Sequence, residues 1–599
     1  MAFPPWNVLQ TGLQSIAEHW IVISIAFVSL VSGACLIGSL LARLRIDSLD
    51  QTSRLALGLS GSLLPLLVLS MPVVLFAVTI KAVVDYRLIF IGLLAGLWVI
   101  VFLLNFKRKT LQVVSWASIV LILLFCLLVI LRLAFIRGMV LPSYPDSVEH
   151  YLIVNDFLNP ADPAQAFYTL DRLLVRYYHF GFHLLAAWIS GLSGAPATEA
   201  MPVLGQLLQA LIPMAVFFPV RVATKSNTAA LFAALLAGLG WSMPSFASNW
   251  SKYPALTGLA CFPFVLSLLY LLDEKSSKKK KWVLILSAAL SGGLAMLAHS
   301  RTIILLLAGV IGLGIVKGME CLSLRLQRWF AALLVCLALL VGALCLIDPL
   351  NARVLSPYLW EGIVTSLLIL ILLPFGVARF PRLVAFSLGF VILVMVCLWI
   401  PLPGSFTQYG YLTPLDQPFV QMILFMPLSM LGGCGLAGVQ SLLLQSHKSA
   451  KKTLWVALAV LLCAAVVGNA FFVYSFTPSA CCQVVSADDQ AAFEWIQENQ
   501  STGMKILVPG HQGPYQFIYV DAGMWITPLT RAATMKWEYS AILTDSDTLR
   551  ELCARKVTHV FTSGFALSFR SEPLEERRDL YQPVLGMGNT GIYQLTGCP

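Results

Sequence analysis

The side chains best suited to chemistry lie in the segment 142–150 (PSYPDSVEH), directly after an apolar run long enough to cross a bilayer. If this segment is helical, Asp146, Glu149 and His150 share one face, because they are spaced i, i+3 and i+4. Ionisable groups near the boundary between water and lipid are costly and usually functional. A carboxylate there can take a proton from a hydroxyl group. The segment therefore predicts a site for a polar substrate at the membrane interface.

Cationic side chains follow in three later segments. Lys252 and Tyr253 lie in the loop 249–254 (NWSKYP), His299 and Arg301 lie in a tight turn between two apolar stretches, and Arg353 follows a further apolar stretch. Lysine and arginine bind phosphate groups, and a site of low dielectric constant strengthens the attraction. Simpler alternatives stay open, since interfacial cations also extend toward lipid headgroups and aromatic residues also anchor helix ends.

The acidic segment has structural alternatives as well. Asp146 follows a proline near a predicted helix start, where a carboxylate stabilises exposed N–H groups without any catalysis. His150 could be a packing histidine, and so could the i, i+4 pair His179 and His183. Asp146 and Glu149 could hold a divalent cation, but no ligand spacing in the sequence identifies a metal or another cofactor. The cofactor requirement therefore stays unknown.

Composition places the chain among membrane proteins. Hydrophobic residues make up 58% of its 599 residues, charged residues make up 11%, and the mean hydropathy is +0.83. The apolar stretches run for roughly 20 residues without a two-residue period, which favours helices over the strands of a β-barrel. We expect a polytopic α-helical bundle of about fifteen spans. The predicted spans include 177–193, 228–247, 362–377 and 383–400.

The charged loops predict the orientation of the bundle. Lys and Arg gather in alternate loops near 43–54, 107–109, 221–225, 275–281, 317–328, 379–382 and 448–452, which are the expected cytoplasmic loops. The same rule puts Asp146, the loop 249–254, the loop 401–418 and all residues after 476 on the outer side. Because these short loops explain the net charge of +10, no nucleic-acid partner is expected.

The composition changes after residue 475, and the remaining stretch 476–599 is long enough for one small α/β domain. Ser486 with Asp489 predicts a capping box at a helix start. Residues 505–508, 516–520, 558–562 and 592–595 predict short strands, and Asp545 or Ser546 predicts the start of a helix through Ala554.

Four cysteines belong to this C-terminal stretch: Cys481, Cys482, Cys553 and Cys598. An outward-facing domain in an oxidising compartment can form disulfides. Our hypothesis is that Cys598, near the chain end, pairs with Cys481 or Cys482 at the start of the domain.

Nucleotide-binding motifs are missing from the sequence. Gly433, Gly435 and Gly438 spell GxGxxG, but they lie inside an apolar stretch with no strand before them, so close helix packing explains them better. Neither a P-loop nor an HExxH motif occurs. This disfavours pumps driven by ATP and transferases that bind a soluble nucleotide sugar in a Rossmann domain.

Taken in order, these features resemble the GT-C class of membrane glycosyltransferases, which use sugars carried on polyprenyl phosphate. The resemblance rests on four features: the segment 144–150 (YPDSVEH), the loop 251–254 (SKYP), the turn 298–301 (AHSR) and a C-terminal outer domain. The outer domain contains AFEWI at 492–496, DAGMWI at 521–526 and THV at 558–560. It implies additional transmembrane helices in 1–110, a GT-C-like catalytic region in 111–475 with an outer loop at 137–176, and an extracytoplasmic α/β domain in 476–599. It also implies a bacterial plasma-membrane location.

The resemblance implies an inverting glycosyltransferase that moves a sugar from a polyprenyl-phosphate donor to a glycan, lipid or protein acceptor of the cell envelope. Asp146, assisted by Glu149, would be the catalytic base. His150, Lys252, Tyr253, His299, Arg301 and Arg353 would bind the substrate and its phosphate. Transfer from a glycosyl phosphate needs one base and cations for the leaving group, whereas a glycosidase needs a second carboxyl group as acid. Two other classes stay open: a transporter or flippase of lipid-linked glycans, and a non-catalytic envelope scaffold.

Overall fold

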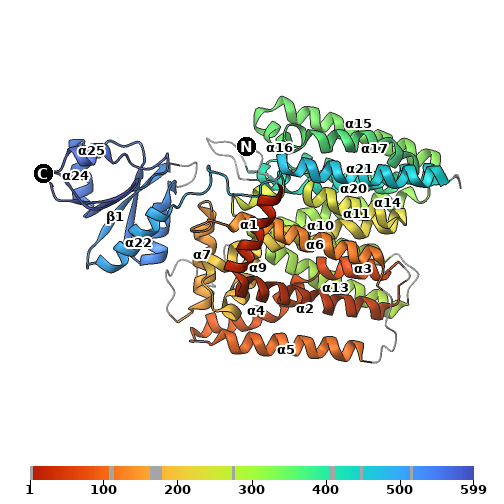
Figure 1. Cartoon of the computed structure of the whole chain (residues 1–599), viewed down its shortest axis with the longest axis horizontal. Coiled ribbons are helices and arrows are strands. Elements are labelled where there is room, and N and C mark those ends of the chain that lie inside the picture. Colours follow the sequence, from red (N-terminus) through yellow and green to blue (C-terminus); the bar gives the residue numbers. More distant parts are fainter. Residues whose placement is uncertain are drawn as a thin grey trace.

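The computed structural model describes residues 5–46, 48–106, 114–161, 178–272, 277–403, 412–444, 449–512 and 517–598. Its long helices run side by side as a bundle, and a β-sheet lies beyond one end of that bundle (Figure 1). We call this end the domain end. Residues 162–176 of the predicted outer loop, residues 404–411 of the loop 401–418 and residue 516 of a predicted strand lie outside the described residues.

The helices of the bundle have the following bounds: α1 Pro5–Glu18, α2 Trp20–Leu44, α3 Gln51–Ser60, α4 Leu63–Ile80, α5 Tyr86–Asn105, α6 Trp116–Leu133, α7 Asp146–Leu158, α9 Gly181–Ser193, α10 Ala197–Thr224, α11 Asn227–Leu239, α12 Tyr253–Leu271, α13 Lys278–Ala298, α14 Thr302–Met319, α15 Leu324–Ile347, α16 Pro349–Leu359, α17 Ile363–Arg379, α18 Pro381–Val396, α19 Gln417–Ile423, α20 Phe425–Leu444 and α21 Ser449–Val473. Short 3₁₀ turns precede the loops that carry the candidate site, at η1 Ala134–Ile136 and η3 Ser245–Ser248.

The number of spans is lower than predicted. Among the described residues, 11 helices are long and apolar enough to cross a membrane, or up to 12 if the bent pair α16 and α17 is one span. The predicted spans at 177–193, 228–247 and 383–400 correspond to α9, α11 and α18, which have only 13, 13 and 16 residues. Thirteen helical residues cover about 20 Å, less than the roughly 30 Å of a hydrocarbon core. The prediction of about fifteen spans was therefore wrong.

Described basic residues at the end of α10 and near the start of α15 lie at the end of the bundle opposite the sheet. Arg221, at the end of α10, forms an ion pair of 2.8 Å with Asp50 before α3. Arg328, near the start of α15, donates to the carbonyl of Ala378 near the end of α17 at 2.8 Å. Because the helices alternate in direction, the acidic segment and the C-terminal sheet share the other end of the bundle (Figure 1).

The C-terminal residues form a mixed six-stranded sheet with helices on both faces. Its strands are β1 Lys505–Gln512, β2 Phe517–Tyr519, β3 Ala533–Glu538, β4 His559–Thr562, β5 Tyr581–Met587 and β6 Thr590–Leu595. The order is β2-β1-β4-β6-β5, and β3 also pairs with β1; β1 is parallel to β3 and β4, and the other pairs are antiparallel. The accompanying helices are α22 Ala487–Asn499, η4 Ala522–Trp525, α23 Ile526–Thr530, α24 Ser546–Ala554 and α25 Glu572–Glu576.

Alternation along β1 builds two hydrophobic cores, because successive side chains of a strand point to opposite faces. Ile506 and Val508 join the core that contains Trp525. Leu507 joins the core on the other face, with Leu552 of α24. The face that holds Trp525 also receives side chains from α7, so the sheet domain is packed against the candidate site.

Several local predictions for this domain are confirmed. Ser486 and Asp489 form the capping box of α22, and Asp545 accepts hydrogen bonds at the start of α24. The predicted strands correspond to β1, β2, β4 and β6, whereas β3 and β5 were missed. β3 alternates Ala533, Met535 and Trp537 with polar residues, so this pattern could have identified it, whereas β5 carries a proline and lacks such alternation.

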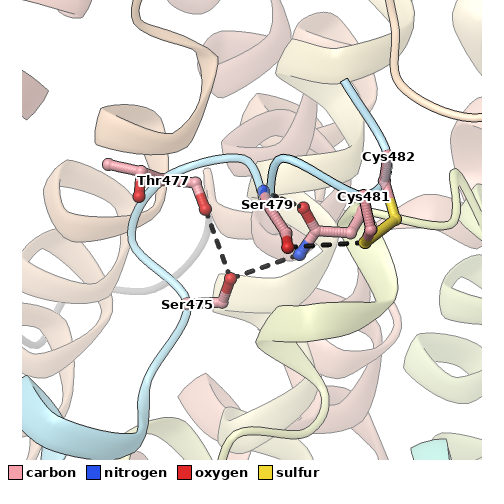
Figure 2. The surroundings of a disulfide bond; sticks show 6 residues. Ser475, Thr477, Ser479, Cys481 and Cys482 are labelled. Atoms are coloured by element: carbon pink, nitrogen blue, oxygen red, sulfur yellow. Dashed lines mark hydrogen bonds between the residues drawn. A yellow bond between two sulfur atoms is a disulfide. The ribbon is translucent and has the colours of Figure 1, made fainter. Parts of the chain in front are cut away.

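The predicted pairing of Cys598 was wrong. Cys598 is bonded to Cys553, with the two Cα atoms 5.9 Å apart, and Cys481 is bonded to its neighbour Cys482. Spatial proximity decides disulfide pairing, and the sequence contains no information on which cysteine approaches the chain end. Figure 2 shows the Cys481–Cys482 bond in the linker that follows α21. In this linker the backbone N–H of Ser479 donates to Asn249 Oδ1 at 2.7 Å, which ties the linker to the loop that carries Lys252.

Candidate functional site

Helix α7 presents the acidic segment at the domain end. It begins at Asp146, whose carboxylate receives no hydrogen bond from a backbone N–H within the described part of the chain. Ser147 Oγ instead closes the turn before the helix by donating to the carbonyls of Tyr144 at 2.6 Å and Pro142 at 3.0 Å. The side chain of Asp146 is therefore not used as a cap and extends toward Lys252.

A buried polar network holds the loop that carries Lys252. Arg132, at the end of α6, is fully buried, and it donates to Gln206 Oε1 at 2.9 Å, to Ser248 Oγ at 3.2 Å and to the carbonyl of Ser475 at 2.7 Å. A buried guanidinium needs all its hydrogen bonds, so these contacts fix three segments relative to one another. Ser251 Oγ adds a hydrogen bond to the carbonyl of Ser143. The acidic segment and the lysine loop are thus joined directly.

The turn between α13 and α14 brings His299, Ser300 and Arg301 to the same place. Its close approach depends on glycines in the neighbouring helices. A Cβ atom on Gly181 of α9 would lie 2.8 Å from Ala298 Cα, and one on Gly258 of α12 would lie 3.0 Å from His299 Cβ. Only glycine leaves room for such contacts between helices.

These elements enclose a cavity of about 280 Å³. Its lining residues come from α7, from the segment before α9, from the start of α12 and from the turn between α13 and α14: Asp146, His150, Tyr178, His179, Lys252, Pro254, Ala255, His299, Ser300 and Arg301. Lys252 Nζ lies 2.5 Å from Asp146 Oδ2, and the two side chains are 33% and 38% exposed. A carboxylate and two cations therefore meet in one accessible cavity.

Three histidines beside the cavity are held neutral. Burial lowers the pKa of His150 to about 4 and that of His179 to about 3, and the positive charges of Arg301 and Lys252 add to the effect on His179. Burial also lowers the pKa of His299 well below its ordinary value. His150 Nδ1 lies 3.0 Å from His183 Nε2, and the rings of His179 and His299 are 4.3 Å apart. The histidines thus supply hydrogen-bonding groups and leave the charge of the cavity to the other residues.

Three of the predicted site residues lie outside the cavity lining. Tyr253 is fully buried and stacks on Phe182, with the ring centroids 5.3 Å apart. Glu149 is exposed, and its carboxylate interacts electrostatically with Lys536 of β3. Arg353 is exposed on α16, where its carbonyl accepts a hydrogen bond from Gln421. None of the three side chains lines the cavity with Asp146 and Lys252.

Sequence reasoning missed several residues of this site. Asp416 forms an ion pair with Arg301, and Phe419 lies 4.9 Å from the ring of His299 in a stacked arrangement. Tyr178 lines the cavity, and Arg132 holds the lysine loop in place through its hydrogen bond to Ser248. Arg132 could have been found, because an arginine inside an apolar stretch is itself a sign of a functional partner. Asp416 gave no such signal, since it lies in a polar loop.

Metal binding has no candidate in the described ranges. No group of three or more His, Cys, Asp or Glu side chains in those ranges is arranged to hold a metal ion. Asp146 and Glu149, which the sequence suggested as ligands, diverge: Asp146 lies in the cavity and Glu149 faces the sheet domain.

The fold defines an integral multi-pass membrane protein of the helical class, with a small mixed β-sheet domain at its C-terminal end. No protein-family model matches the chain, and no curated protein matches it. Among solved structures, it is similar to the one titled "Single-Particle Cryo-EM Structure of Arabinofuranosyltransferase AftD from Mycobacteria", with a TM-score of 0.45 and 14% sequence identity. The similarity covers 81% of this chain and 40% of that one, so this chain spans less than half of that protein's length.

Proposed function

We propose that the protein is an inverting glycosyltransferase of the GT-C type. It transfers a sugar from a polyprenyl-phosphate donor to a cell-envelope glycan, lipid or protein. The reaction takes place at the domain end of the bundle, which faces the outer side of a bacterial plasma membrane. The sheet domain is extracytoplasmic in this proposal, because the basic loops lie at the opposite end.

The convergence of Asp146, Lys252 and Arg301 on one cavity carries this proposal. Lys252 lies 106 positions from Asp146 in the chain, and Arg301 lies 115 positions from its partner Asp416. The fold nevertheless brings Asp146, Lys252 and Arg301 together beside neutral histidines. One carboxylate with two cations suits a reaction that needs a single base and an anionic leaving group. The cavity volume of about 280 Å³ is near the lower end for small-molecule sites, which fits a sugar phosphate whose lipid tail stays in the membrane.

The reaction proceeds as a single displacement. The acceptor hydroxyl gives its proton to a carboxylate oxygen of Asp146, and its oxygen forms a bond to the anomeric carbon. The bond between the anomeric carbon and the phosphate oxygen breaks at the same time, and its electron pair stays on the polyprenyl phosphate. Lys252 and Arg301 stabilise the charge that develops on this leaving group.

Both cations have carboxylate partners, Lys252 with Asp146 and Arg301 with Asp416. An incoming phosphate competes for the same N–H donors. When Lys252 turns toward the phosphate, the carboxylate of Asp146 becomes available to the acceptor hydroxyl. Donor binding therefore prepares the base for its task.

The test is transfer of a radiolabelled sugar from polyprenyl phosphate by the purified protein in lipid nanodiscs. Asp146→Asn should lower the rate by about 100-fold or more, because general-base catalysis contributes at least that much. Asp348→Asn is the matched control, since Asp348 caps α16 with its carboxylate and lies outside the cavity. Undiminished transfer by folded Asp146→Asn would contradict the proposal. Movement of the labelled lipid across the bilayer without transfer would indicate a transporter instead.

A further inference from the structure

A second and larger cavity opens at the domain end, on another side of α7. Its volume is about 400 Å³. The side chains that matter for its chemistry come from the start of α5 and from α7: Asp85, Tyr86, Arg87, Tyr151, Asn155 and Asn159. The turn between α9 and α10 completes the wall with small residues. None of these residues has a role in the proposed transfer.

Helix α7 separates the two cavities. Tyr151 and Asn155 are four residues apart, so they lie on one face of α7, and Asn159 follows directly after the helix ends at Leu158. Tyr151 and Asn155 are turned by about 140° and about 180° from Asp146, at 3.6 residues per turn. The same helix thus lines the catalytic cavity with one face and the second cavity with another.

The second cavity is built from fixed elements. Tyr86 Oη donates to the carbonyl of Phe157 on α7 at 2.7 Å, which ties α5 to α7. The ring of Tyr151 lies 5.4 Å from that of Trp525 in the sheet domain. Gly194, with φ +74°, turns the chain between α9 and α10 and leaves open space where a side chain would stand. A ligand therefore meets a largely preformed site, which reduces the entropy lost on binding.

The lining favours a neutral ligand with many hydroxyl groups. The two asparagine amides provide both donors and acceptors, and Asp85 and Arg87 are exposed groups of opposite charge that balance each other. The lining of the catalytic cavity, by contrast, includes two cations and one carboxylate, and Asp416, the partner of Arg301, lies outside that lining. Val84, Leu158 and the small residues of the turn between α9 and α10 add apolar surface to the lining, against which the C–H faces of sugar rings can pack.

We propose that this second cavity binds the saccharide chain of the acceptor. This inference rests on the proposed function and adds the acceptor class, a neutral oligosaccharide. Asp146 and Asn155 are separated by about 13 Å along α7, at 1.5 Å per residue, and by about half a turn around it. An oligosaccharide of several residues is long enough for this path, so a chain held by the asparagine face can present its terminal hydroxyl to Asp146.

The experiment measures saturation transfer from the full-length protein in nanodiscs to neutral linear hexasaccharides of glucose, mannose, galactose or arabinose. At least one of them should bind, and Asn155→Leu should weaken that binding at least tenfold. Arg87→Gln is the second variant. Arg87 lies on α5 and is exposed at the rim of the cavity, so its substitution does not disturb α7. Asn499→Leu is the control, because Asn499 lies at the end of α22 and donates to the carbonyl four residues earlier, as Asn159 does.

Absence of binding by every hexasaccharide overturns the inference, and so does binding that both variants leave unchanged. A phospholipid that copurifies with the protein and is lost in Asn155→Leu overturns it in favour of a lipid site. The binding measurement contains no donor, so its outcome does not depend on the transfer reaction. If the transfer reaction fails, the binding measurement still tests the saccharide site. The proposed function and this inference can therefore fail separately.

Discussion

The stability of the sheet domain should depend on the protonation of Asp521. This carboxyl group is fully buried at the start of η4, where it accepts hydrogen bonds from the backbone N–H of Gly523 at 2.8 Å, from Ser563 Oγ at 3.1 Å and from Ser568 Oγ at 2.7 Å. Burial outweighs these hydrogen bonds and raises the pKa of Asp521 from 3.8 to about 7. The folded domain thus holds a proton that the unfolded chain releases near pH 4.

The direction of the pH effect follows from this difference in bound protons. Between about pH 4 and about pH 7 the folded state binds more protons than the unfolded state, so the free energy of unfolding falls as the pH rises. Over this whole pH range the free energy of unfolding falls by about 4 kcal/mol, at 1.36 kcal/mol per pKa unit. Between pH 5.5 and pH 7 it falls by about 2 kcal/mol, and Asp521 should cause no further fall at higher pH.

Hydrogen exchange of the β1 and β4 amides in the full-length protein measures this effect, after correction for the intrinsic rates at pH 5.5 and pH 8. The amides should be better protected at pH 5.5 by about 2 kcal/mol. Asp521→Asn preserves the size of the side chain and removes its titration, with Nδ2 donating to a serine hydroxyl where Oδ2 accepts from one, and it should remove at least half of the difference. Some dependence should persist, because burial also raises the pKa of Asp489.

Asp545→Asn is the control for this experiment. Asp545 is an exposed helix cap in the same domain, so its substitution should leave the pH difference intact. Equal protection at the two pH values would refute the reasoning, and so would a pH difference that Asp521→Asn leaves undiminished.

Three further substitutions test other parts of the structure. Lys252→Met should raise the KM for the donor by roughly 10- to 100-fold, because one charge-assisted hydrogen bond to phosphate is lost; an unchanged KM would remove Lys252 from the donor site. Gly181→Ala should also weaken donor binding, since the added methyl group would displace the end of α13, whereas Gly293→Ala on α13 meets open space and should bind the donor normally. Cys598→Ser breaks the bond to Cys553 and should lower the free energy of unfolding of the sheet domain by about 4 kcal/mol, for a loop of 45 residues; unchanged urea unfolding would show that the bond is dispensable.

The sequence predicted individual side chains of the cavity better than it predicted their partners. Asp146 and His150 share a helix face by their spacing, and both line the cavity. Lys252 and Arg301 were found because Lys and Arg are sparse on the expected outer side of the bundle. Asp416 and Phe419 were not found, since their contacts with Arg301 and His299 cross more than a hundred residues of chain and no local pattern records such a contact.

Adjacent residues show the same limit of prediction from the local sequence. Lys252 and Tyr253 are adjacent, yet Lys252 lines the cavity while Tyr253 is buried against Phe182, because the first turn of α12 directs them to different sides. The span count failed for a related reason. Hydropathy does not distinguish a helix that contacts lipid from one such as α11, which is apolar because the bundle buries it. Helix length makes that distinction, and length depends on turns that the sequence specifies poorly.

The structure gives the sheet domain a share in positioning the proposed base. Val148 and Leu152 lie on α7 with Asp146, but they belong to the hydrophobic core that contains Trp525. Exposing each of them would cost roughly 1.5–3 kcal/mol, so the sheet domain helps to hold α7 in place.

The linker between the two parts acts in the same way. The carbonyl of Cys482 accepts a hydrogen bond of 3.0 Å from the N–H of Tyr144, just before α7, and the N–H of Ser479 donates to Asn249 Oδ1 in the lysine loop. The short linker therefore touches both the segment that carries Asp146 and the loop that carries Lys252. A shift of the sheet domain would therefore alter the distance between the proposed base, Asp146, and Lys252. The C-terminal domain thus helps to set the geometry of the candidate site.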